Sequence, residues 1–208
     1  MGRIPPRPPE NTTDKAEQIL NGAMQEFLAR GYAGTSMDRV SAAAGVSKAT
    51  VYSYFQDKEG LFSALIQNLA QERLLSGYVP FQEPEIFLRE LAGFLLNRMM
   101  SDRQYLTFVR LIIGESNRFP ELAQTFVRNL AKPGVDRLCQ YFQQHPELNL
   151  PDPEAIAHIF IGSIVYYSLN QELMHGKHVM PLERDRLIDG LMYLILKPNS
   201  DRQPFNSQ

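Results

Sequence analysis

The stretch TSMDRVSAAAGVSKATVYSYF, residues 35–55, constrains the fold of this 208-residue chain more than any other segment. Gly45 divides it into two short runs of helix-compatible residues, and Ser47, a residue type favoured at helix N-termini, follows at once. Glycine adopts positive φ without steric cost, and the small side chains of Ala42–Ala44 allow two helices to approach closely. The stretch therefore predicts two short helices that cross steeply, a helix–turn–helix.

The rest of the chain also shows helical periodicity. Patterns typical of helix starts occur at Asp14–Glu17, Thr35–Asp38, Ser47, Asp57, Pro84, Asp102 and Pro120. Gly31 is expected to end the first helix, and Pro133 to kink or split a helix over 120–144. The last two helices are predicted over 153–175 and 182–197, and the sequence holds no sustained strand-type alternation. These patterns predict an all-α fold of about nine helices.

Composition and charge exclude several classes of protein. The apolar runs are much shorter than the roughly 20 residues that span a bilayer, and the N-terminus lacks the apolar segment of a secretory signal. The single cysteine, Cys139, rules out an internal disulfide and is typical of a reducing compartment. We therefore expect a cytoplasmic protein without a membrane partner. The net charge of −2 gives no general basic excess, so any nucleic-acid contact must be local.

The second short helix of the predicted motif has a distinctive surface. Residues 47–56 contain one cation, Lys48, with several hydroxyl groups and no acidic side chain. Hydroxyls and a cation at a helix N-terminus suit contacts with phosphates and base edges, and small Ala49 allows close approach to a groove floor. The pattern favours DNA binding. The alternative is that Tyr52 and Tyr54 are half-buried core residues of a protein that does not bind DNA.

Residues 31–62, GYAGTSMDRVSAAAGVSKATVYSYFQDKEGLF, resemble the DNA-binding region of the tetracycline-repressor-like (TetR/AcrR) family of bacterial transcription regulators. The resemblance implies a homodimer that binds a near-palindromic operator in double-stranded DNA, commonly as a repressor. It places phosphate contacts at Thr35, Tyr52, Tyr54 and Lys58, and base-edge contacts at Lys48, Ala49, Thr50 and Ser53. The full predicted DNA-binding set is Thr35, Ser36, Ser47, Lys48, Ala49, Thr50, Tyr52, Ser53, Tyr54 and Lys58.

The resemblance also implies how the chain is organised. We expect a disordered arm at 1–12, a three-helix DNA-binding domain at 13–60, a regulatory and dimerisation domain at 61–198 and a flexible tail at 199–208. A fourth helix, about 58–75, would link the domains, and 76–84 is the most plausible boundary between them. The segment 114–126 resembles part of the regulatory domain in one subgroup of the family. In the family, a small effector bound to this domain shifts the population away from the DNA-binding conformation.

Two surfaces of the regulatory domain are predicted from its apolar residues. Candidate walls of a pocket for a small, mostly apolar effector are Phe87, Leu91, Leu95, Met99, Tyr105, Phe108, Ile112, Phe126 and Tyr166. The alternative is that these residues form a filled core. The helix over 156–169 is apolar around most of its circumference and needs cover on several sides. Candidate dimer-interface residues on this helix and the last one are Ile156, Ile159, Phe160, Ser163, Tyr167, Leu187, Leu191 and Leu194.

Other functions find little support in the sequence. His175 and His178 lie in a short loop without a cysteine or carboxylate at a suitable spacing, so we expect neither a metal site nor a cofactor. Paired ionisable groups, a glycine-rich phosphate loop and a nucleophile elbow are all lacking, so we expect no enzyme activity. The alternative function is a helical ligand-binding module, or an enzyme, that does not use its helix–turn–helix on DNA.

Overall fold

The computed structural model describes residues 11–74 and 83–196, and side chains within 15–69 and 83–196. Residues 1–10 of the predicted arm, 76–82 of the predicted boundary and the predicted tail lie outside the described residues. The α-helices are α1 (Asn11–Gly34), α2 (Met37–Ala43), α3 (Lys48–Phe55), α4 (Lys58–Leu74), α5 (Pro84–Ser101), α6 (Arg103–Glu115), α7 (Pro120–Phe126), α8 (Lys132–Gln144), α9 (Pro153–Ser168) and α10 (Arg184–Leu196). The described residues form no strand, so the predicted all-α fold is confirmed.

Two compact units make up the chain. The first contains residues up to Leu69 together with Leu111–Phe126, and the second contains Ala70–Arg110 and the residues from Val127 onward. Helix α6 therefore begins in the second unit and ends in the first. As a result, the segment 111–126, which the sequence associates with the regulatory domain, packs with the N-terminal helices.

Aromatic side chains form the centre of the first unit. Phe27 of α1 and Phe62 of α4 are fully buried, with ring centroids 5.3 Å apart in an edge-to-face arrangement. Tyr32 stacks on Phe27 at 5.7 Å, and Phe119 meets Tyr32 edge-on at 5.1 Å. Such pairs contribute about 0.5–1.5 kcal/mol each beyond the burial of their area. They join the end of α1, the start of α4 and the α6–α7 turn.

Five of the seven predicted helix starts are confirmed, three by a capping hydrogen bond and two by a proline in the first turn. Ser47 Oγ accepts from the amide of Thr50 at 3.1 Å, Asp57 Oδ1 from Gly60 at 2.7 Å, and Asp102 Oδ1 from Tyr105 at 2.9 Å. Pro84 and Pro120 open α5 and α7, where a missing amide hydrogen costs nothing. Helices α3, α4, α5, α6 and α7 thus begin where local chemistry predicts.

Two predicted starts are wrong. Helix α1 begins at Asn11, so Asp14 lies inside the helix and is not its N-cap. Helix α2 is capped by Ser36, whose Oγ accepts from the amide of Arg39 at 3.3 Å, rather than by Thr35. The Thr35 hydroxyl is instead directed to Gly31 O, to which it donates at 2.8 Å. The predicted interruption at Gly31 is confirmed, with φ 71° and ψ 174°.

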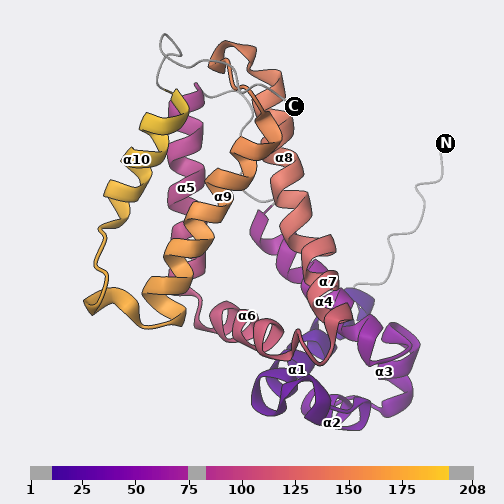
Figure 1. Ribbon diagram of the computed structural model, residues 1–208. Helices are drawn as coiled ribbons and strands as arrows, with labels where there is room; N and C mark the ends of the chain where they lie inside the picture. Colours follow the sequence, from indigo (N-terminus) through magenta and orange to yellow (C-terminus); the bar gives the residue numbers. More distant parts are fainter. Residues whose placement is uncertain (1–10, 75–82, 197–208) are drawn as a thin grey trace, which may run out of the picture. The chain divides into compact units, whose positions relative to one another are not determined.

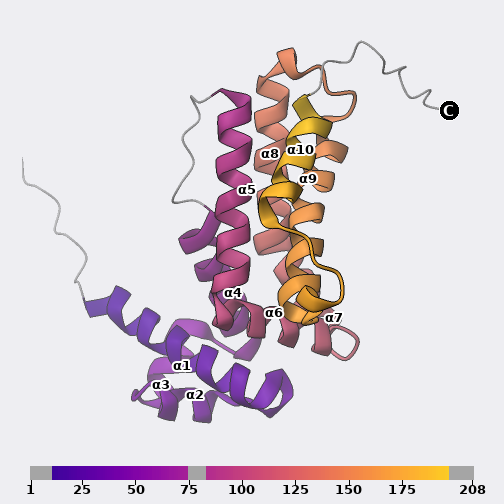
Figure 2. The same ribbon diagram turned by 90° about the vertical axis from the view of Figure 1, so that its left-hand side faces the viewer.

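The second unit is a bundle in which α5, α8, α9 and α10 run alongside one another (Figures 1 and 2). Its buried core includes Leu88 and Leu96 of α5, Phe142 of α8, and Phe160 and Ile164 of α9. The predicted split before Pro133 is also confirmed. A wider π-helical turn, Val127–Ala131, separates α7 from α8 and lets Pro133 lie in the first turn of α8.

Candidate nucleic-acid interface

The turn between α2 and α3 is closed by backbone hydrogen bonds that only a residue with positive φ allows. Gly45 has φ 64°, its amide donates to Ala42 O at 3.2 Å, and the amide of Val46 donates to Ser41 O at 3.0 Å. This is a Schellman closure, in which glycine takes the left-handed position at no Cβ cost. Val51, fully buried, anchors α3 beyond the turn. The predicted helix–turn–helix is present.

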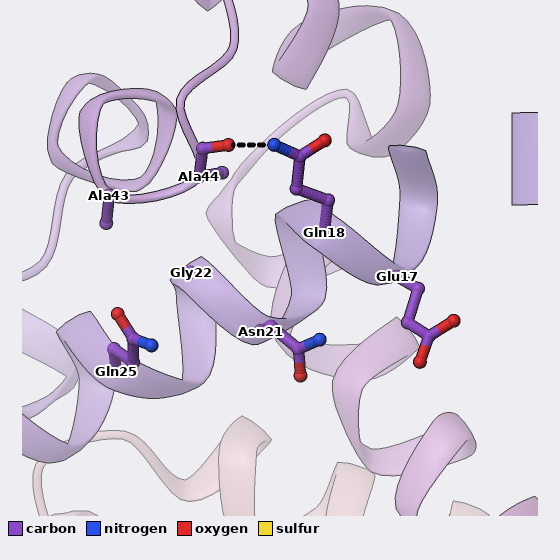
Figure 3. A pocket seen from close by; sticks show the side chains of 7 residues that line it. All are labelled: Glu17, Gln18, Asn21, Gly22, Gln25, Ala43 and Ala44. Carbon is purple, nitrogen blue, oxygen red and sulfur yellow. Dashed lines mark hydrogen bonds between the residues drawn. The ribbon is translucent and has the colours of Figure 1, made fainter. Parts of the chain in front are cut away.

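Helix α1 supports this turn at close range. Gln18 Nε2 donates to Ala44 O at 2.7 Å, as Figure 3 shows. One helical turn further along α1, a Cβ placed on Gly22 would lie 2.8 Å from Ala44 N and 2.9 Å from Ala44 Cβ. The backbones of α1 and of the turn therefore touch, and only glycine fits at position 22. An open polar cavity of about 430 Å³ flanks the contact, lined by Glu17, Gln18, Asn21, Gly22, Gln25, Ala43 and Ala44.

The Gly22→Ala variant is expected to lower the free energy of unfolding by about 1–3 kcal/mol, the usual cost of overpacking a close contact. The atoms that meet the new methyl belong to the backbone and Cβ of Ala44, which cannot rotate away. Urea unfolding of the full chain measures the change. Gly114→Ala is the matched control, because a Cβ there meets nothing within 4 Å. Equal stabilities for the two variants would contradict the proposed backbone contact.

Most of the predicted DNA-binding side chains on α3 are accessible. Ser47, Lys48, Ala49, Tyr52 and Ser53 are exposed, whereas Thr50 and Tyr54 are half-buried. The 43% exposure of Tyr52 argues against the alternative in which this ring is part of the core. Lys48, Ala49, Tyr52 and Ser53 share one face of α3 by helical spacing, and Ser47 caps its N-terminus. That face is small, polar and free of acidic side chains.

Hydrogen bonds hold the hydroxyl groups of this face in place. Ser47 Oγ and Thr50 Oγ1 are 2.8 Å apart, and Ser53 Oγ donates to Thr50 O at 2.8 Å. The Lys48 ammonium lies 2.6 Å from Asp38 Oδ1 of α2 and 5.9 Å from the centre of the Tyr52 ring. Asp38, by hydrogen bond and by charge, raises the pKa of Lys48, so the cation stays fully protonated at neutral pH. The face thus presents one cation and hydroxyl groups whose positions are fixed by internal hydrogen bonds.

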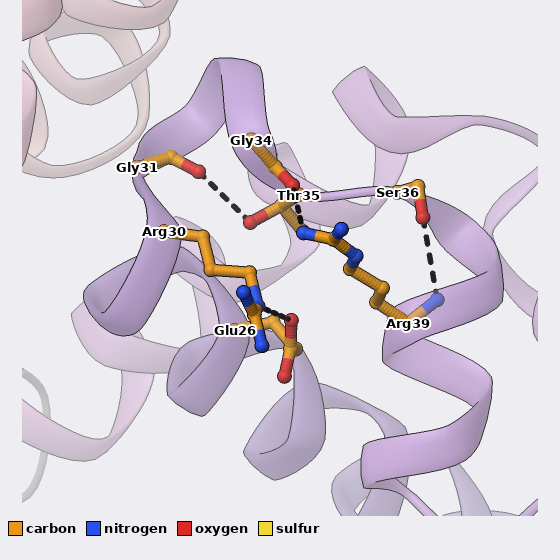
Figure 4. A network of polar contacts seen from close by, with 7 residues as sticks. All are labelled: Glu26, Arg30, Gly31, Gly34, Thr35, Ser36 and Arg39. Carbon is orange, nitrogen blue, oxygen red and sulfur yellow. Dashed lines mark hydrogen bonds and ion pairs between the residues drawn. The ribbon is translucent and has the colours of Figure 1, made fainter.

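Thr35 does not offer its side chain to a phosphate. It is 3% exposed, and its hydroxyl is directed to Gly31 O across the break in α1 (Figure 4). The burial argues against the predicted phosphate contact and gives Thr35 a role in shaping the α1–α2 turn. Ser36, also predicted, is exposed beside it. Arg39, which sequence reasoning missed, is exposed on α2 and donates from Nη1 to Gly34 O at 2.9 Å.

Lys58 links the start of α4 to the α1–α2 turn. Its ammonium donates to Tyr32 O at 2.8 Å and to Thr35 O at 3.1 Å, and lies 4.3 Å from the centre of the Tyr32 ring. Partial burial lowers the pKa of Lys58, while burial raises the pKa of Tyr32 to about 12. Two of the three ammonium donors are thus engaged by carbonyls. The phosphate contact of Lys58 stays a prediction, and it would use the third.

The predicted pocket residues of the regulatory region belong to both units and differ in burial. Phe87, Tyr105, Phe108 and Ile112 are buried, and Leu91, Leu95, Met99 and Phe126 are half-buried. Ile112 and Phe126 belong to the first unit. Tyr166 is 61% exposed, so its assignment to a pocket wall is wrong. Two buried polar atoms that the sequence did not flag, Ser168 Oγ and Arg98 Nε, lack a hydrogen-bond partner among the described residues.

The predicted dimer residues divide between the core and the surface. Phe160, Tyr167 and Leu191 are buried within the chain, so their assignment to an interface is wrong. Ile159 and Leu194 are exposed by 53% and 56%, while Ile156, Ser163 and Leu187 are half-buried. Tyr193 of the last helix and Tyr166, which the sequence assigned to a pocket wall, are each 61% exposed. Ile159, Ser163 and Tyr166 lie three and four residues apart and so share one face of α9.

Other kinds of site find no support in the described residues. None of the helices there is both long and apolar enough to cross a membrane. Within the same ranges, no cluster of three or more His, Cys, Asp or Glu side chains could hold a metal ion. His175 and His178 are exposed at a short 3-10 turn, Gly176–His178.

Comparison with known proteins relates two regions of the chain, which together make up most of its length, to one family. Residues 19–65 match the bacterial regulatory proteins of the tetR family, and residues 87–197 match the C-terminal domain of AefR-like transcriptional repressors. The flavonoid-responsive regulator FrrA has a similar structure, with a TM-score of 0.72 and 30% identity over 89% of this chain and 97% of FrrA.

Curated relatives match over shorter stretches. The chain is 39% identical over 59 residues to YhgD of Bacillus subtilis, an uncharacterized HTH-type transcriptional regulator, covering 28% of this chain and 31% of YhgD. It is 26% identical over 138 residues to AcrR of Shigella flexneri, covering 63% of this chain and 64% of AcrR. The chain thus spans less than two thirds of the length of either relative. With both family regions matched in order and the helix–turn–helix formed, the chain belongs to the TetR family of bacterial transcription regulators, a family of DNA-binding proteins and not of enzymes.

Proposed function

We propose that this protein is a homodimeric repressor that binds a near-palindromic operator and leaves it when a small aromatic effector binds. The observation that carries the proposal is the polar, acid-free face of α3, which is held by the turn at its N-terminus and by the buried Val51 in its middle. A chromosomal target would place its action in the bacterial cytoplasm. The proposed DNA contacts are Ser36, Ser47, Lys48, Ala49, Thr50, Tyr52, Ser53, Tyr54 and Lys58, without the Thr35 side chain.

The proposed dimer uses the apolar faces that α9 and α10 leave exposed. Ile159 and Tyr166 on α9 and Tyr193 and Leu194 on α10 are each more than half exposed, although neighbouring residues of both helices fill the core. Large exposed apolar side chains that gather on two helices of one bundle mark an association surface. A two-fold pairing of this surface would present two copies of α3, which symmetric half-sites about 34 Å apart require.

The proposed effector is a planar aromatic compound with a few polar groups. FrrA, 30% identical over most of both chains, is named as flavonoid-responsive. The core of the second unit includes aromatic residues such as Phe87 and Phe160, and in the same unit Ser168 Oγ and Arg98 Nε are buried without a protein partner. Buried polar atoms normally have a hydrogen-bond partner, so these two are candidates to bind hydroxyl or carbonyl groups of an effector. Flavonoids combine such groups with an apolar ring system.

The contacts of the α6–α7 segment suggest how the effector signal reaches the DNA-binding helices. Phe119 packs on Tyr32, and a Cβ on Gly31 would lie 2.9 Å from Glu115 Oε1. The carbonyl of Tyr32 in turn holds the Lys58 ammonium. A shift at the end of α6 would therefore move the α1–α2 turn. The effector acts if it favours the α6 position that fits the operator less well.

The test is selection of DNA fragments by the purified full chain, followed by gel shifts at fixed salt. Thr50→Ala and Lys48→Ala are expected to change which sequences are preferred, by about five- to a hundredfold per altered base position, because base contacts carry 1–3 kcal/mol of discrimination. Tyr52→Phe is expected to weaken binding to all DNA sequences equally, because it removes a phosphate contact. Gln25→Ala, an exposed amide on α1, is the control and should change neither property.

Flavonoids added to the operator complex are then expected to release the protein. A chain that selects no sequence would overturn the DNA-binding proposal and favour a ligand-binding module that does not use its helix–turn–helix. Unaltered preferences in both the Thr50 and Lys48 variants would contradict the assignment of α3 as the reading helix. Binding that persists with every flavonoid tested would reject that effector class while leaving the operator assignment intact.

A further inference from the structure

One ion pair links the two helices of the DNA-binding motif. The Lys48 ammonium of α3 lies 2.6 Å from Asp38 Oδ1 of α2, and both side chains are more than half exposed. Between Ser36 and Gln56 the only charged residues are Asp38, Arg39 and Lys48. Lys48 is thus the single cation of α3, and a carboxylate from the neighbouring helix already holds it.

Asp38 occupies a position in α2 that suits an anion and brings its carboxylate to Lys48. It lies in the first turn of α2, where the partial positive charge of a helix N-terminus favours an anion. Arg39, the next residue, is engaged elsewhere, since its Nη1 donates to Gly34 O at 2.9 Å. The nearest charge that Asp38 contacts in the described part of the chain is therefore Lys48. The ammonium, in turn, lies 5.9 Å from the Tyr52 ring centre, within the range of a cation–π contact.

This geometry affects the two modes of DNA binding differently. Non-operator DNA is bound through phosphates, and its affinity grows with each cation that releases counterions. A lysine whose charge is offset by a neighbouring carboxylate adds little to that term. An operator base can still accept a hydrogen bond from the two remaining N–H donors of the ammonium, which the carboxylate and the Tyr52 ring hold in one orientation.

We propose that Asp38 is a specificity-determining residue, which offsets the charge of Lys48 toward phosphates and orients its ammonium toward the edge of an operator base. Specificity is the difference between the affinities for operator and for non-operator DNA. A residue that lowers the affinity for non-operator DNA therefore raises specificity, just as an added contact to the operator would. The inference rests on the proposed function and assigns a role to a residue outside the predicted DNA-contact set. Because exposed ion pairs contribute little to folding, the role is expected to appear in DNA binding and not in stability.

The test compares the affinities of operator and non-operator duplexes for the Asp38→Asn variant of the full chain. We expect non-operator affinity to rise about three- to tenfold, and the slope of log affinity against log salt to steepen by about 0.9, as one more phosphate contact requires. The ratio of operator to non-operator affinity should fall by a similar factor, while the melting temperature stays unchanged. Asp38→Ser also suits the first turn of a helix and should behave in the same way.

A double-mutant cycle with Lys48→Met separates this role from plain charge repulsion. In the Lys48→Met background, Asp38→Asn is expected to leave the affinity ratio unchanged. Glu59→Gln removes an exposed carboxylate from the first turn of α4 and controls for net charge. It should alter both affinities by less than twofold.

An equal effect of Asp38→Asn with and without Lys48 would overturn the inference, because Asp38 would then act as a general negative charge. An unchanged affinity ratio in the single variant would overturn it as well. Both results leave the proposed function standing, provided that the wild-type chain still prefers its operator. If the wild-type chain prefers no DNA sequence, both the proposed function and this inference are wrong.

Discussion

Replacing Gly31 by valine is expected to lower the free energy of unfolding of this protein by about 3 kcal/mol or more. Gly31 has φ 71° and ψ 174°, a region of backbone space that is almost restricted to glycine, and a residue forced into it costs about 1–3 kcal/mol. A β-branched side chain is at the upper end of this range. The new Cβ would also lie 2.9 Å from Glu115 Oε1, so the α6–α7 segment would have to move.

Urea unfolding, followed by circular dichroism, measures this loss on the full chain. Ala33→Val is the matched control: it adds a valine two residues away on an exposed position outside the positive-φ region, and should cost less than about 1 kcal/mol. Operator affinity should fall in parallel, since the α1–α2 turn binds the Lys58 ammonium of α4 through Tyr32 O and the Thr35 hydroxyl through Gly31 O. A Gly31→Val variant as stable as the wild type would contradict the glycine-restricted backbone conformation described for this position.

The Ile159→Glu variant is expected to be a monomer and to bind a full operator at least about a hundredfold more weakly than the wild type. A carboxylate in the middle of the proposed apolar interface would be buried without a partner, and each protomer carries its own copy of the substitution. Without the dimer, the second half-site is no longer bound at the high effective concentration that linkage provides, which is worth 10²–10⁴ in affinity. Analytical ultracentrifugation and gel shifts measure the two effects.

Ile86→Glu is the matched control for the dimer prediction. Ile86 is 48% exposed on α5 of the same unit, compared with 53% for Ile159, so both variants place a charge on a half-exposed isoleucine. The control is expected to remain dimeric and to bind the operator normally. A dimeric Ile159→Glu variant would contradict the interface, and loss of the dimer in both variants would indicate a general loss of folding.

The helix–turn–helix was predictable from sequence because its chemistry is local. A glycine at the turn, a serine cap two residues on and an apolar anchor at Val51 each act within a few residues. Thr35 shows where such reasoning stops. The spacing of Thr35 and Asp38 predicts a cap at Thr35, but the hydroxyl donates to Gly31 O, because the break in α1 brings that carbonyl within reach. The direction of one hydroxyl thus depends on a backbone conformation that no capping pattern encodes.

The residues of α9 that are exposed could not be predicted from the sequence, for a different reason. The helix is apolar around most of its circumference, so hydrophobic periodicity gives no preferred face. Phe160 and Ile159 are neighbours of similar character, yet the first is fully buried and the second is 53% exposed. Only the position of α5 and α8 against α9 decides which of the two faces the core. The packing of the segment 111–126 in the first unit was equally unpredictable from sequence, because it brings together residues that are far apart in the chain.

Helix α3 has a single fully buried residue, Val51, and its remaining support comes from the backbone closure at Gly45 and from its capping serine. Folding of the helix–turn–helix therefore depends little on which side chains α3 exposes to solvent. With α3 as the proposed reading helix, substitutions at Lys48, Ala49, Thr50 and Ser53 would alter the recognised sequence while the fold is preserved. Under this proposal, a few changes confined to one and a half turns of helix would be enough for the regulator to acquire new target genes. The same tolerance to substitution would make this chain a convenient scaffold for engineered operator recognition.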